Sequence, residues 1–186
     1  MVLGLTGGIG AGKSMALAAF RRRGCPTLSS DEVVHGLYAT AEVRDAVVAR
    51  FGRDVLDEFG EVDRTLLAPL AFADPAARGF LETLLHPLVA VELERFREAH
   101  ADDQILVHEV PLLYEAGLAD RYDAVVVITA PDDVRRLRAP GRFDERSSTQ
   151  LPEAGKVELA DYVIVNDGDP AQLDAAVGAL LQALRR

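Results

Sequence analysis

The stretch Gly7-Gly8-Ile9-Gly10-Ala11-Gly12-Lys13-Ser14 decides the fold of this chain. It fits the pattern of a glycine, four residues, and then glycine, lysine and serine, and it follows the short apolar run from Val2 to Leu5. A strand, a glycine-rich turn and a helix N-terminus in this order predict a phosphate-binding loop, because consecutive backbone N–H groups and the helix dipole converge on one anion. A glycine turn that only packs a helix against a sheet does not account for the Lys-Ser pair. The chain is therefore expected to bind a nucleoside triphosphate.

The loop supplies the first candidate site residues. Lys13 is expected to reach the β and γ phosphates, and the Ser14 hydroxyl is expected to bind the Mg²⁺ that bridges them. The remaining cofactor contacts are expected along the loop, at Gly8, Ile9, Gly10, Ala11, Gly12 and Met15.

Length and composition limit the class of protein. With 186 residues, the chain is long enough for one α/β core and too short for two full domains, so any further part is expected to be a lid or a small helical insertion. The 20 basic and 30 acidic residues give a formal charge of −10, which argues against nucleic acid or an anionic membrane as a partner. A single cysteine, Cys25, and the lack of a long apolar run or a charged leader predict a soluble cytoplasmic protein.

The carboxyl end of the second expected strand carries an acid, Asp31. A helix over 15–23 is expected to end at Gly24, a short strand follows over 26–28, and Ser29-Ser30-Asp31 comes where open parallel sheets place their ligands. Asp31 has two compatible interpretations. It can be the N-cap or first-turn acid of a helix over 32–38, and it can be the base that accepts the proton of an attacking hydroxyl.

The segment 41–100 predicts helices almost throughout and contains no convincing strand, so we expect an inserted helical unit beside the nucleotide core. The expected helices cover 42–51, 65–72, 75–85 and 87–100, with Asp63 and Asp74 as N-caps and Pro75 in a first turn. In small kinases, such an insertion commonly holds the phosphate acceptor. His86 precedes the proline that opens the last of these helices, and both a capping role and a ligand contact are open for it.

Three further strands are expected, over 104–110, 123–129 and 161–166, followed by a closing helix over 170–184. Glu109 comes at the carboxyl end of the first of these strands, where an acid can orient metal-bound water or an acceptor group. His108 alternates away from Glu109 and is expected to pack or to face solvent. Together with the two earlier strands, this order predicts an α/β fold: a five-stranded parallel sheet in a three-layer P-loop NTPase-type domain, with a helical substrate-binding insertion and a lid.

An arginine-rich segment follows the fourth expected strand. It contains Arg135, Arg136, Arg138, Arg142 and Arg146, around Pro140 and Gly141. A solvated charge run is the ordinary interpretation of such a segment. Here the arginines fall where a lid would close over the triphosphate, and planar cations stabilise charge on a transferring phosphoryl group. We therefore expect a lid over about 135–152, a core of about 1–40 and 101–186, and the helical insertion over about 41–100.

The remaining motifs narrow the reaction class. No Asn-Lys-x-Asp signature and no Asp-x-x-Gly switch after a strand are present, which argues against a GTPase and leaves the layout of a small-molecule kinase. In order along nearly the whole chain, several segments resemble the dephospho-CoA kinase family: Leu3 to Ser14, His86-Pro87, Val110-Pro111-Leu112-Leu113-Tyr114-Glu115, Gln150-Leu151-Pro152 and Ala160-Asp161-Tyr162-Val163-Ile164-Val165-Asn166. The Pro-Leu-Leu-Tyr-Glu and Ala-Asp-Tyr-Val-Ile-x-Asn segments are more selective than the phosphate loop alone.

This resemblance implies transfer of the γ-phosphoryl group of ATP, with Mg²⁺, to the ribose 3′-hydroxyl of dephospho-CoA, the last step of coenzyme A synthesis. Asp31 matches the acid that the family uses as base. Arg138 and Arg146 are the expected lid arginines. Arg146 lies four residues before Gln150, which matches the spacing in the family. Asn166 is expected at the adenine end of the ATP site. The candidates for acceptor contacts are Thr6, Asp31, His86, Glu109, Leu113, Tyr114 and Glu115.

Some positions depart from the family pattern. The family commonly has Asp-Ala-Asp at Ser29-Ser30-Asp31, threonine at Met15 and arginine at Ala90, for which Arg95 or Arg97 could substitute; the lid is also shorter than usual. Two alternatives therefore stay open: a kinase of the same architecture with another hydroxyl or a nucleoside monophosphate as acceptor, and a nucleotide-binding regulator that has lost turnover. The expected state is a monomer or a weak homo-oligomer, with dephospho-CoA as the small-molecule partner.

Overall fold

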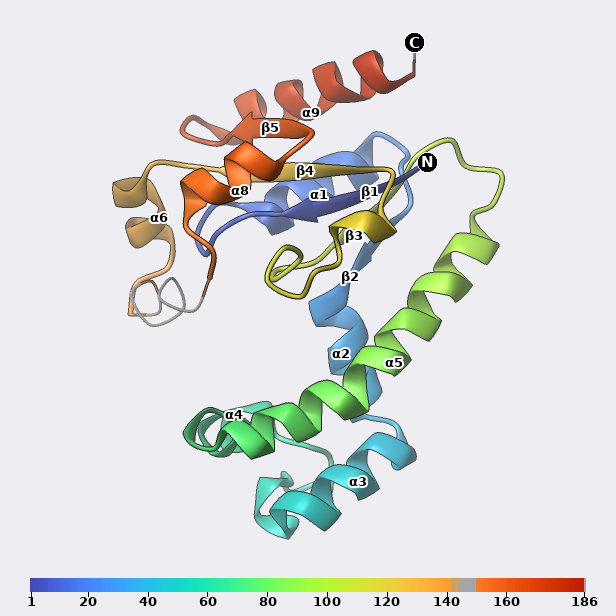
Figure 1. The fold of residues 1–186 in the computed structure, drawn as a ribbon, viewed down its shortest axis with the longest axis vertical. Coiled ribbons are helices and arrows are strands. Elements are labelled where there is room, and N and C mark those ends of the chain that lie inside the picture. Colours follow the sequence, from blue (N-terminus) through green and yellow to red (C-terminus); the bar gives the residue numbers. More distant parts are fainter. Residues whose placement is uncertain (142, 144–149, 186) are drawn as a thin grey trace. The chain divides into compact units, whose positions relative to one another are not determined.

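Figure 1 shows the computed structural model, which describes residues 1–141, 143 and 150–185. Its sheet contains β1 (Val2–Thr6), β2 (Thr27–Ser29), β3 (Leu106–Glu109), β4 (Ala124–Thr129) and β5 (Tyr162–Val165). The strand order is β2-β3-β1-β4-β5, and every neighbouring pair is parallel, which confirms the expected α/β fold. Because the strands run in one direction, their carboxyl ends share one edge of the sheet, with β1 at its centre.

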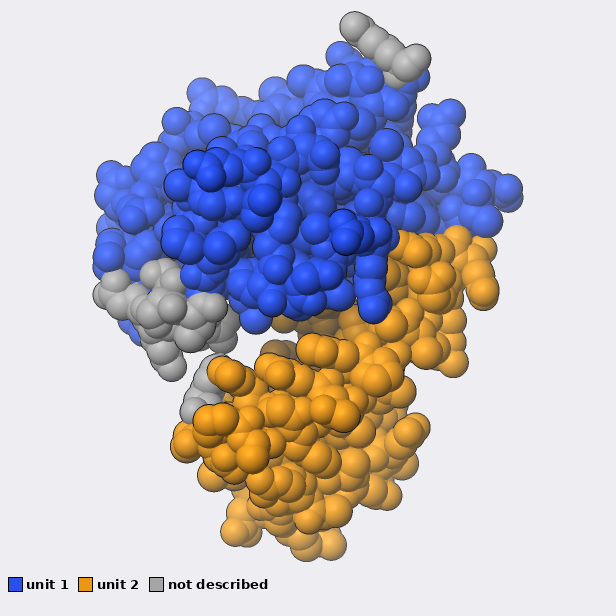
Figure 2. Space-filling view, viewed as in Figure 1, with its two compact units in different colours: residues 1–29, 100–186 blue, residues 30–99 orange. Residues whose placement is uncertain are grey.

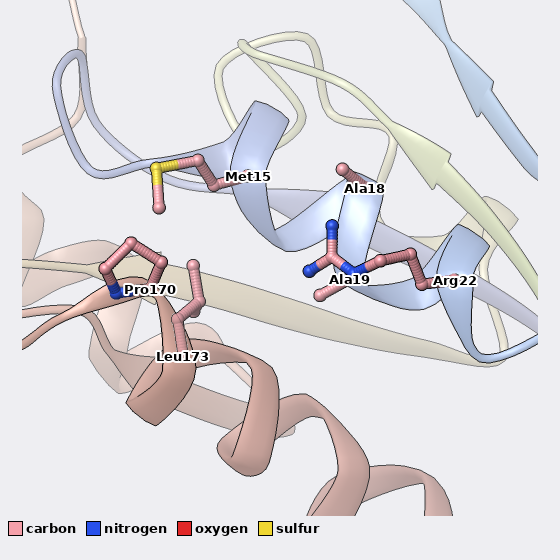
Figure 3. Close-up of a pocket in the computed structure, with 6 residues that line it drawn as sticks. All are labelled: Met15, Ala18, Ala19, Arg22, Pro170 and Leu173. Atoms are coloured by element: carbon pink, nitrogen blue, oxygen red, sulfur yellow. The ribbon is translucent and has the colours of Figure 1, made fainter.

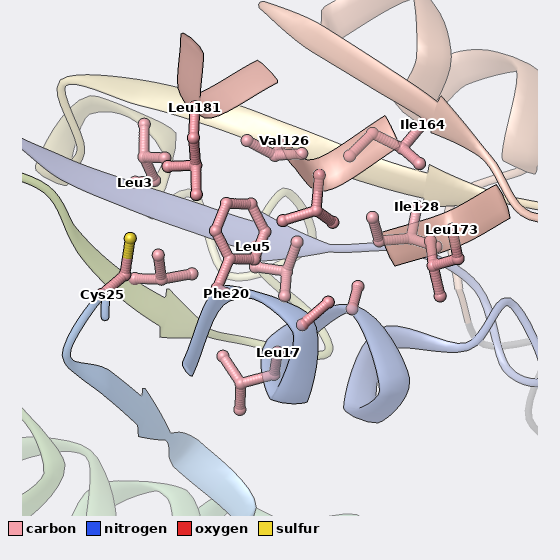
Figure 4. Close-up of a cluster of buried hydrophobic side chains, with 14 of the residues drawn as sticks. Leu3, Leu5, Leu17, Phe20, Cys25, Val126, Ile128, Ile164, Leu173 and Leu181 are labelled. Atoms are coloured by element: carbon pink, nitrogen blue, oxygen red, sulfur yellow. The ribbon is translucent and has the colours of Figure 1, made fainter. Parts of the chain in front are cut away.

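One face of the sheet is covered by α1 (Lys13–Arg22) and α9 (Pro170–Leu184), which also pack against each other. Phe20 and Leu173 from these helices meet Leu5 of β1 and Ile128 of β4 in one buried cluster (Figure 4). The continuous apolar run of β4 is buried along almost its whole length, as its sequence predicts for a strand covered on both sides.

The opposite face is covered by the segment 110–122, which includes the short helix η2 (Ala119–Arg121), and by α8 (Glu153–Leu159). Leu113 and Val127 belong to its buried cluster, against which Tyr122 and Val157 pack. His108 is buried, and its Nδ1 lies 2.8 Å from the Tyr122 hydroxyl, so it is a packing residue. Elements on both faces of one parallel sheet give the three expected layers. A further helix, α6 (Asp132–Arg138), follows β4.

The chain divides into two compact units, Met1–Ser29 with His100–Arg186, and Ser30–Ala99 (Figure 2). The second unit consists of α2 (Ser30–Tyr38), α3 (Ala41–Phe51), the short η1 (Arg53–Val55), α4 (Arg64–Ala73) and α5 (Pro75–Ala99). Its own core contains Tyr38, Val43, Val47, Val55, Leu67, Leu81 and Leu85. No helix in the described part of the chain combines the length and the apolar character that a membrane crossing requires.

The helix N-termini of the second unit follow the local sequence signals. The Asp63 carboxylate accepts the Thr65 backbone N–H at 2.7 Å, and the Asp74 carboxylate accepts the Ala76 N–H at 2.8 Å. Both acids therefore stabilise the first turn of a helix, as expected.

Some boundaries in this unit differ from the expectations. The helices expected over 75–85 and 87–100 form one helix, α5, with Pro87 in its interior. Pro87 lacks the N–H that would bond to the carbonyl one turn earlier, but the preceding turns carry Leu81 and Leu85, whose burial in the core keeps the helix continuous. His86 is therefore an exposed mid-helix residue and not a cap. The second unit begins at Ser30, whereas the helical insertion was expected from about residue 41. The helix α2, expected over 32–38, also begins at Ser30, so Asp31 lies in its first turn and is not the N-cap.

Candidate active site

The phosphate loop, residues 7–14, leaves the carboxyl end of the central strand β1 and leads into α1. Gly10 (φ 76°) and Gly12 (φ 97°) adopt left-handed backbone conformations, which glycine tolerates without strain. Gly12 is the N-cap of α1 and makes no side-chain cap, so the first backbone N–H groups of the helix can bind an anion. The Lys13 ammonium donates to the Gly8 carbonyl at 3.4 Å and thus lies along the loop. Ser14 is exposed in the first turn.

One side of the loop packs directly on α6 and α8. A Cβ atom at Gly8 would overlap the Arg135 guanidinium and the Glu153 carboxylate, and one at Gly10 would overlap the Arg135 backbone. The Arg135 side chain is 7% exposed; its Nη1 donates to Glu153 Oε2 at 2.7 Å and its Nη2 to Asp132 Oδ1 at 2.9 Å. The sequence places Arg135 in the arginine-rich segment but gives no signal for its contact with Gly8, because that contact depends on the tertiary fold.

The other side of the loop packs on the segment after β5. Asn166 is 2% exposed, and its Nδ2 donates to the Ala11 carbonyl at 2.7 Å. A Cβ atom at Gly12 would overlap this amide and lie 4.0 Å from Arg138 Nη1. The same Nη1 donates to the Asn166 backbone carbonyl at 2.9 Å, which places one of the two expected lid arginines beside the loop. Asn166 was expected at the adenine end of the ATP site, and the structure shows its side chain bonded to the phosphate loop. The other expected lid arginine, Arg146, lies outside the described residues.

The acid at the end of β3, Glu109, is 5% exposed and pairs in the sheet with Leu5 of β1 and Ser29 of β2. The Ser29 hydroxyl donates to Glu109 Oε2 at 2.9 Å, which fixes one carboxylate oxygen. Thr6 is fully buried, and its hydroxyl donates to the Pro111 carbonyl at 3.4 Å. Glu109 therefore lies on the strand next to β1, the strand from which the phosphate loop leaves. The Thr6 hydroxyl is engaged by the backbone that follows β3.

The turn after β3 carries three further candidates, Leu113, Tyr114 and Glu115. Leu113 is fully buried, and burial raises the pKa of the Tyr114 hydroxyl, with the nearby Asp161 charge acting in the same direction. Glu115 Oε1 accepts the backbone N–H of residue 151 at 2.7 Å and lies 3.0 Å from Nζ of the fully buried Lys156. Glu115 thus joins this turn to α8 through an ion pair.

Replacing Glu115 with glutamine is expected to lower the free energy of unfolding by about 2 kcal/mol, because the buried Lys156 ammonium keeps its charge but loses the carboxylate that compensates it. Thermal unfolding followed by circular dichroism should show a midpoint lower by roughly 4–8 °C for a chain of this size. Glu158→Gln, at an exposed position of α8, is the matched control and should change stability by less than about 0.5 kcal/mol. A Glu115→Gln midpoint equal to that of the control would show that the pair contributes little.

Asp31 and His86 belong to the second unit. Asp31 is exposed in the first turn of α2, two residues after Ser29 ends β2. His86 is exposed on α5, which packs against α2. Chain connectivity therefore links Asp31 to the strand end that carries the Ser29–Glu109 hydrogen bond.

Comparison with known proteins identifies the family of this chain. The sequence matches the family model described as dephospho-CoA kinase over residues 1–172. The chain belongs to the dephospho-CoA kinase family. A dephospho-CoA kinase of Anaeromyxobacter dehalogenans is 40% identical over 194 residues, which cover 99% of this chain and 92% of that protein.

Two solved structures extend the likeness to three dimensions. One from Thermus thermophilus is 30% identical and has a TM-score of 0.85 over 99% of this chain and 97% of that chain. A dephospho-CoA kinase from Campylobacter jejuni is 21% identical, with a TM-score of 0.73 over 98% and 96% of the two chains, and shares the fold.

Two departures from the dephospho-CoA kinase pattern have a local structural account. At Ser29, a hydroxyl donates to Glu109, whereas an aspartate would place a second carboxylate against that acid. Met15 is 41% exposed and lines a groove between α1 and α9 with Pro170 and Leu173 (Figure 3). The groove has a volume of about 190 Å³. A threonine at position 15 would replace an apolar wall of this groove with a hydroxyl.

The third departure, Ala90, lies on α5. The two arginines that could substitute for the missing side chain pair with acids one turn earlier, Arg95 with Glu92 at 2.5 Å and Arg97 with Glu94 at 3.1 Å. An acceptor phosphate that engaged either arginine would therefore compete with a carboxylate of the same helix.

Proposed function

We propose that this member of the dephospho-CoA kinase family transfers the γ-phosphoryl group of ATP to the ribose 3′-hydroxyl of dephospho-CoA, which gives coenzyme A. The observation that carries the proposal is the phosphate loop, in which Gly12 leaves the N-terminus of α1 without a side-chain cap and Lys13 lies along the loop. Family membership supports the acceptor, since a relative matched over nearly its whole length is a dephospho-CoA kinase.

The donor phosphates would bind the loop. Its backbone N–H groups and Lys13 offset the charge that spreads over the phosphoryl oxygens during transfer. Arg138, held by the carbonyl of Asn166, adds a planar cation at the same end of α1. The hydrogen bonds of Asn166 to the loop and of Arg138 to Asn166 support these donors, which limits the reorganisation that the reaction requires.

The residues present fit Mg²⁺ as the ion that accompanies ATP. Ser14 offers a hydroxyl in the exposed first turn of α1. Within the described ranges, no group of three or more histidine, cysteine or acidic side chains could hold a metal ion, which fits an ion that takes most of its ligands from phosphate and water. Bound there, Mg²⁺ would neutralise charge on the β and γ phosphates.

The acceptor needs a base, because a sugar hydroxyl is a weak nucleophile. We assign this role to Asp31. As the hydroxyl oxygen bonds to the γ-phosphorus and the bond to the bridging oxygen of ADP breaks, the hydroxyl proton moves to the Asp31 carboxylate. His86 is a further candidate for contact with the acceptor, whereas Glu115 is already engaged by Lys156.

Purified protein is expected to form ADP from Mg-ATP when dephospho-CoA is added, with coenzyme A appearing in equal amount. A coupled assay for ADP and mass spectrometry of the product measure both. AMP and small hydroxylated metabolites serve as alternative acceptors and should not raise the rate above background. Stimulation by one of these instead would reassign the acceptor, and ATP binding without stimulation by any acceptor would identify a nucleotide-binding regulator.

A further inference from the structure

Arg135 differs from the other arginines of α6 because it is buried, whereas Arg136 and Arg138 are exposed. Its guanidinium donates to Glu153 and Asp132 at 2.7 and 2.9 Å, and its Cζ lies 5.0 Å from the centroid of the Phe143 ring. A buried cation is costly unless it is paired. The two carboxylates therefore compensate the buried charge and hold the guanidinium in one orientation.

Gly8 connects this ion pair to the phosphate loop. The space that a Cβ atom of Gly8 would fill is taken by Arg135 Nη1 and Glu153 Oε2. The carbonyl of the same residue accepts the Lys13 ammonium at 3.4 Å and the Ala11 backbone N–H at 3.2 Å. Gly8 is thus fixed by the guanidinium on one side, and through its carbonyl it orients Lys13.

We propose that Arg135 is a positioning residue for phosphoryl transfer, which acts through Gly8 to hold Lys13 in the phosphate loop; this rests on the proposed kinase function. Arg135 need not touch the phosphates. It sets the position of the Gly8 peptide, and a displacement of a reacting group by about 1 Å can cost on the order of 100-fold in rate. Arginine suits this place because its planar fork bonds to Glu153 and Asp132 at once, which the single ammonium of lysine does less well.

The first test is Arg135→Met, which keeps the apolar stem and removes the fork. We expect about tenfold weaker ATP binding and about tenfold lower kcat, with the KM for dephospho-CoA within about twofold of wild type. Titration with a fluorescent ATP analogue and the coupled assay measure these values. Arg135→Lys keeps the charge and one ion pair, and it should recover roughly half of each loss on a logarithmic scale.

The matched control is Arg23→Met. Arg23 Nη2 pairs with Asp174 Oδ2 at 2.5 Å at the opposite end of α1 from the phosphate loop, so this variant also removes a partly buried arginine pair. It should lower thermal stability while leaving kcat and ATP affinity within about twofold of wild type. Equal losses of kcat in Arg23→Met and Arg135→Met would overturn the proposal.

A double-mutant cycle tests the route through Lys13. In a Lys13→Met background, Arg135→Met should change kcat and ATP affinity by less than about threefold, because the residue through which Arg135 acts is gone. Losses that multiply, or wild-type values for Arg135→Met alone, would overturn the proposal. If Arg135→Met does not fold, Arg135→Lys carries the cycle: its loss of about threefold beside the native Lys13 should shrink to less than about 1.5-fold in the Lys13→Met background, and an undiminished loss would overturn the proposal.

The test separates this inference from the kinase assignment. A wild-type protein that binds ATP but does not convert dephospho-CoA would refute the proposed reaction. The cycle is then read on ATP affinity alone, where non-additive effects of Arg135→Met and Lys13→Met support the positioning role and additive effects overturn it.

Discussion

Replacing Lys13 with methionine is expected to lower kcat by about 10²–10³-fold and to weaken ATP binding by about tenfold. Methionine keeps the apolar stem but removes the one lysine of the phosphate loop. The backbone N–H groups of the loop are expected to bind the ground-state phosphates still, whereas charge that develops on the transferring phosphoryl oxygens would lose the cation that Lys13 supplies under the proposed function. We therefore expect kcat to fall by a larger factor than the affinity for ATP. Steady-state kinetics with dephospho-CoA and titration with an ATP analogue separate the two effects.

Arg22→Met is the control for this variant. Arg22 belongs to the same helix, is exposed, and pairs with Asp174 at 2.8 Å, so its replacement removes the same unit of charge away from the loop. Its kcat and ATP affinity should stay within about twofold of wild type. Wild-type kcat and ATP affinity in Lys13→Met would remove the phosphate-loop assignment.

Many helix and strand boundaries of this protein were predictable from local signals in the sequence. The closing helix α9 was expected over 170–184 and is found at Pro170–Leu184, where Asp169 and Gln172 form a capping box and Pro170 opens the first turn. In α5, the local signal of Pro87 points to a helix end, but packing of Leu81 and Leu85 in the core outweighs it. The continuity of α5 through Pro87 thus depends on tertiary packing, which a short stretch of sequence does not reveal.

In the site, too, local motifs were predictable from the sequence and tertiary contacts were not. The positions of Lys13 and Ser14 could be predicted from the sequence because a short motif places them at the start of α1. Arg135 and Glu153 contact the loop from distant parts of the chain. No spacing in the sequence predicts that a side chain at position 8 would overlap them. Of the two ion pairs described for Arg135, the one with Asp132 is local, at three residues along one helix.

Replacing Asp31 with asparagine is expected to lower kcat by about 100-fold or more while ATP affinity stays within about twofold of wild type. Asparagine has nearly the same shape, but its amide cannot take the proton of the acceptor hydroxyl. Glu32→Gln is the matched control, because Glu32 is the other acid in the first turn of α2 and its neutralisation removes a similar interaction with the helix dipole. The coupled assay and the ATP titration are run on both variants under the same conditions.

The contrast between the two variants isolates proton transfer from helix stability. If Asp31 only stabilised α2, Asp31→Asn and Glu32→Gln would lose similar, small amounts of unfolding free energy and would keep their turnover. Glu109 provides a second comparison, since it is the acid at the end of the neighbouring strand and is held by Ser29 at 2.9 Å. Turnover that survives Asp31→Asn but is lost in Glu109→Gln would move the base to Glu109. Loss in Asp31→Asn alone, with ATP still bound, requires a carboxylate that acts on the acceptor and not on the donor.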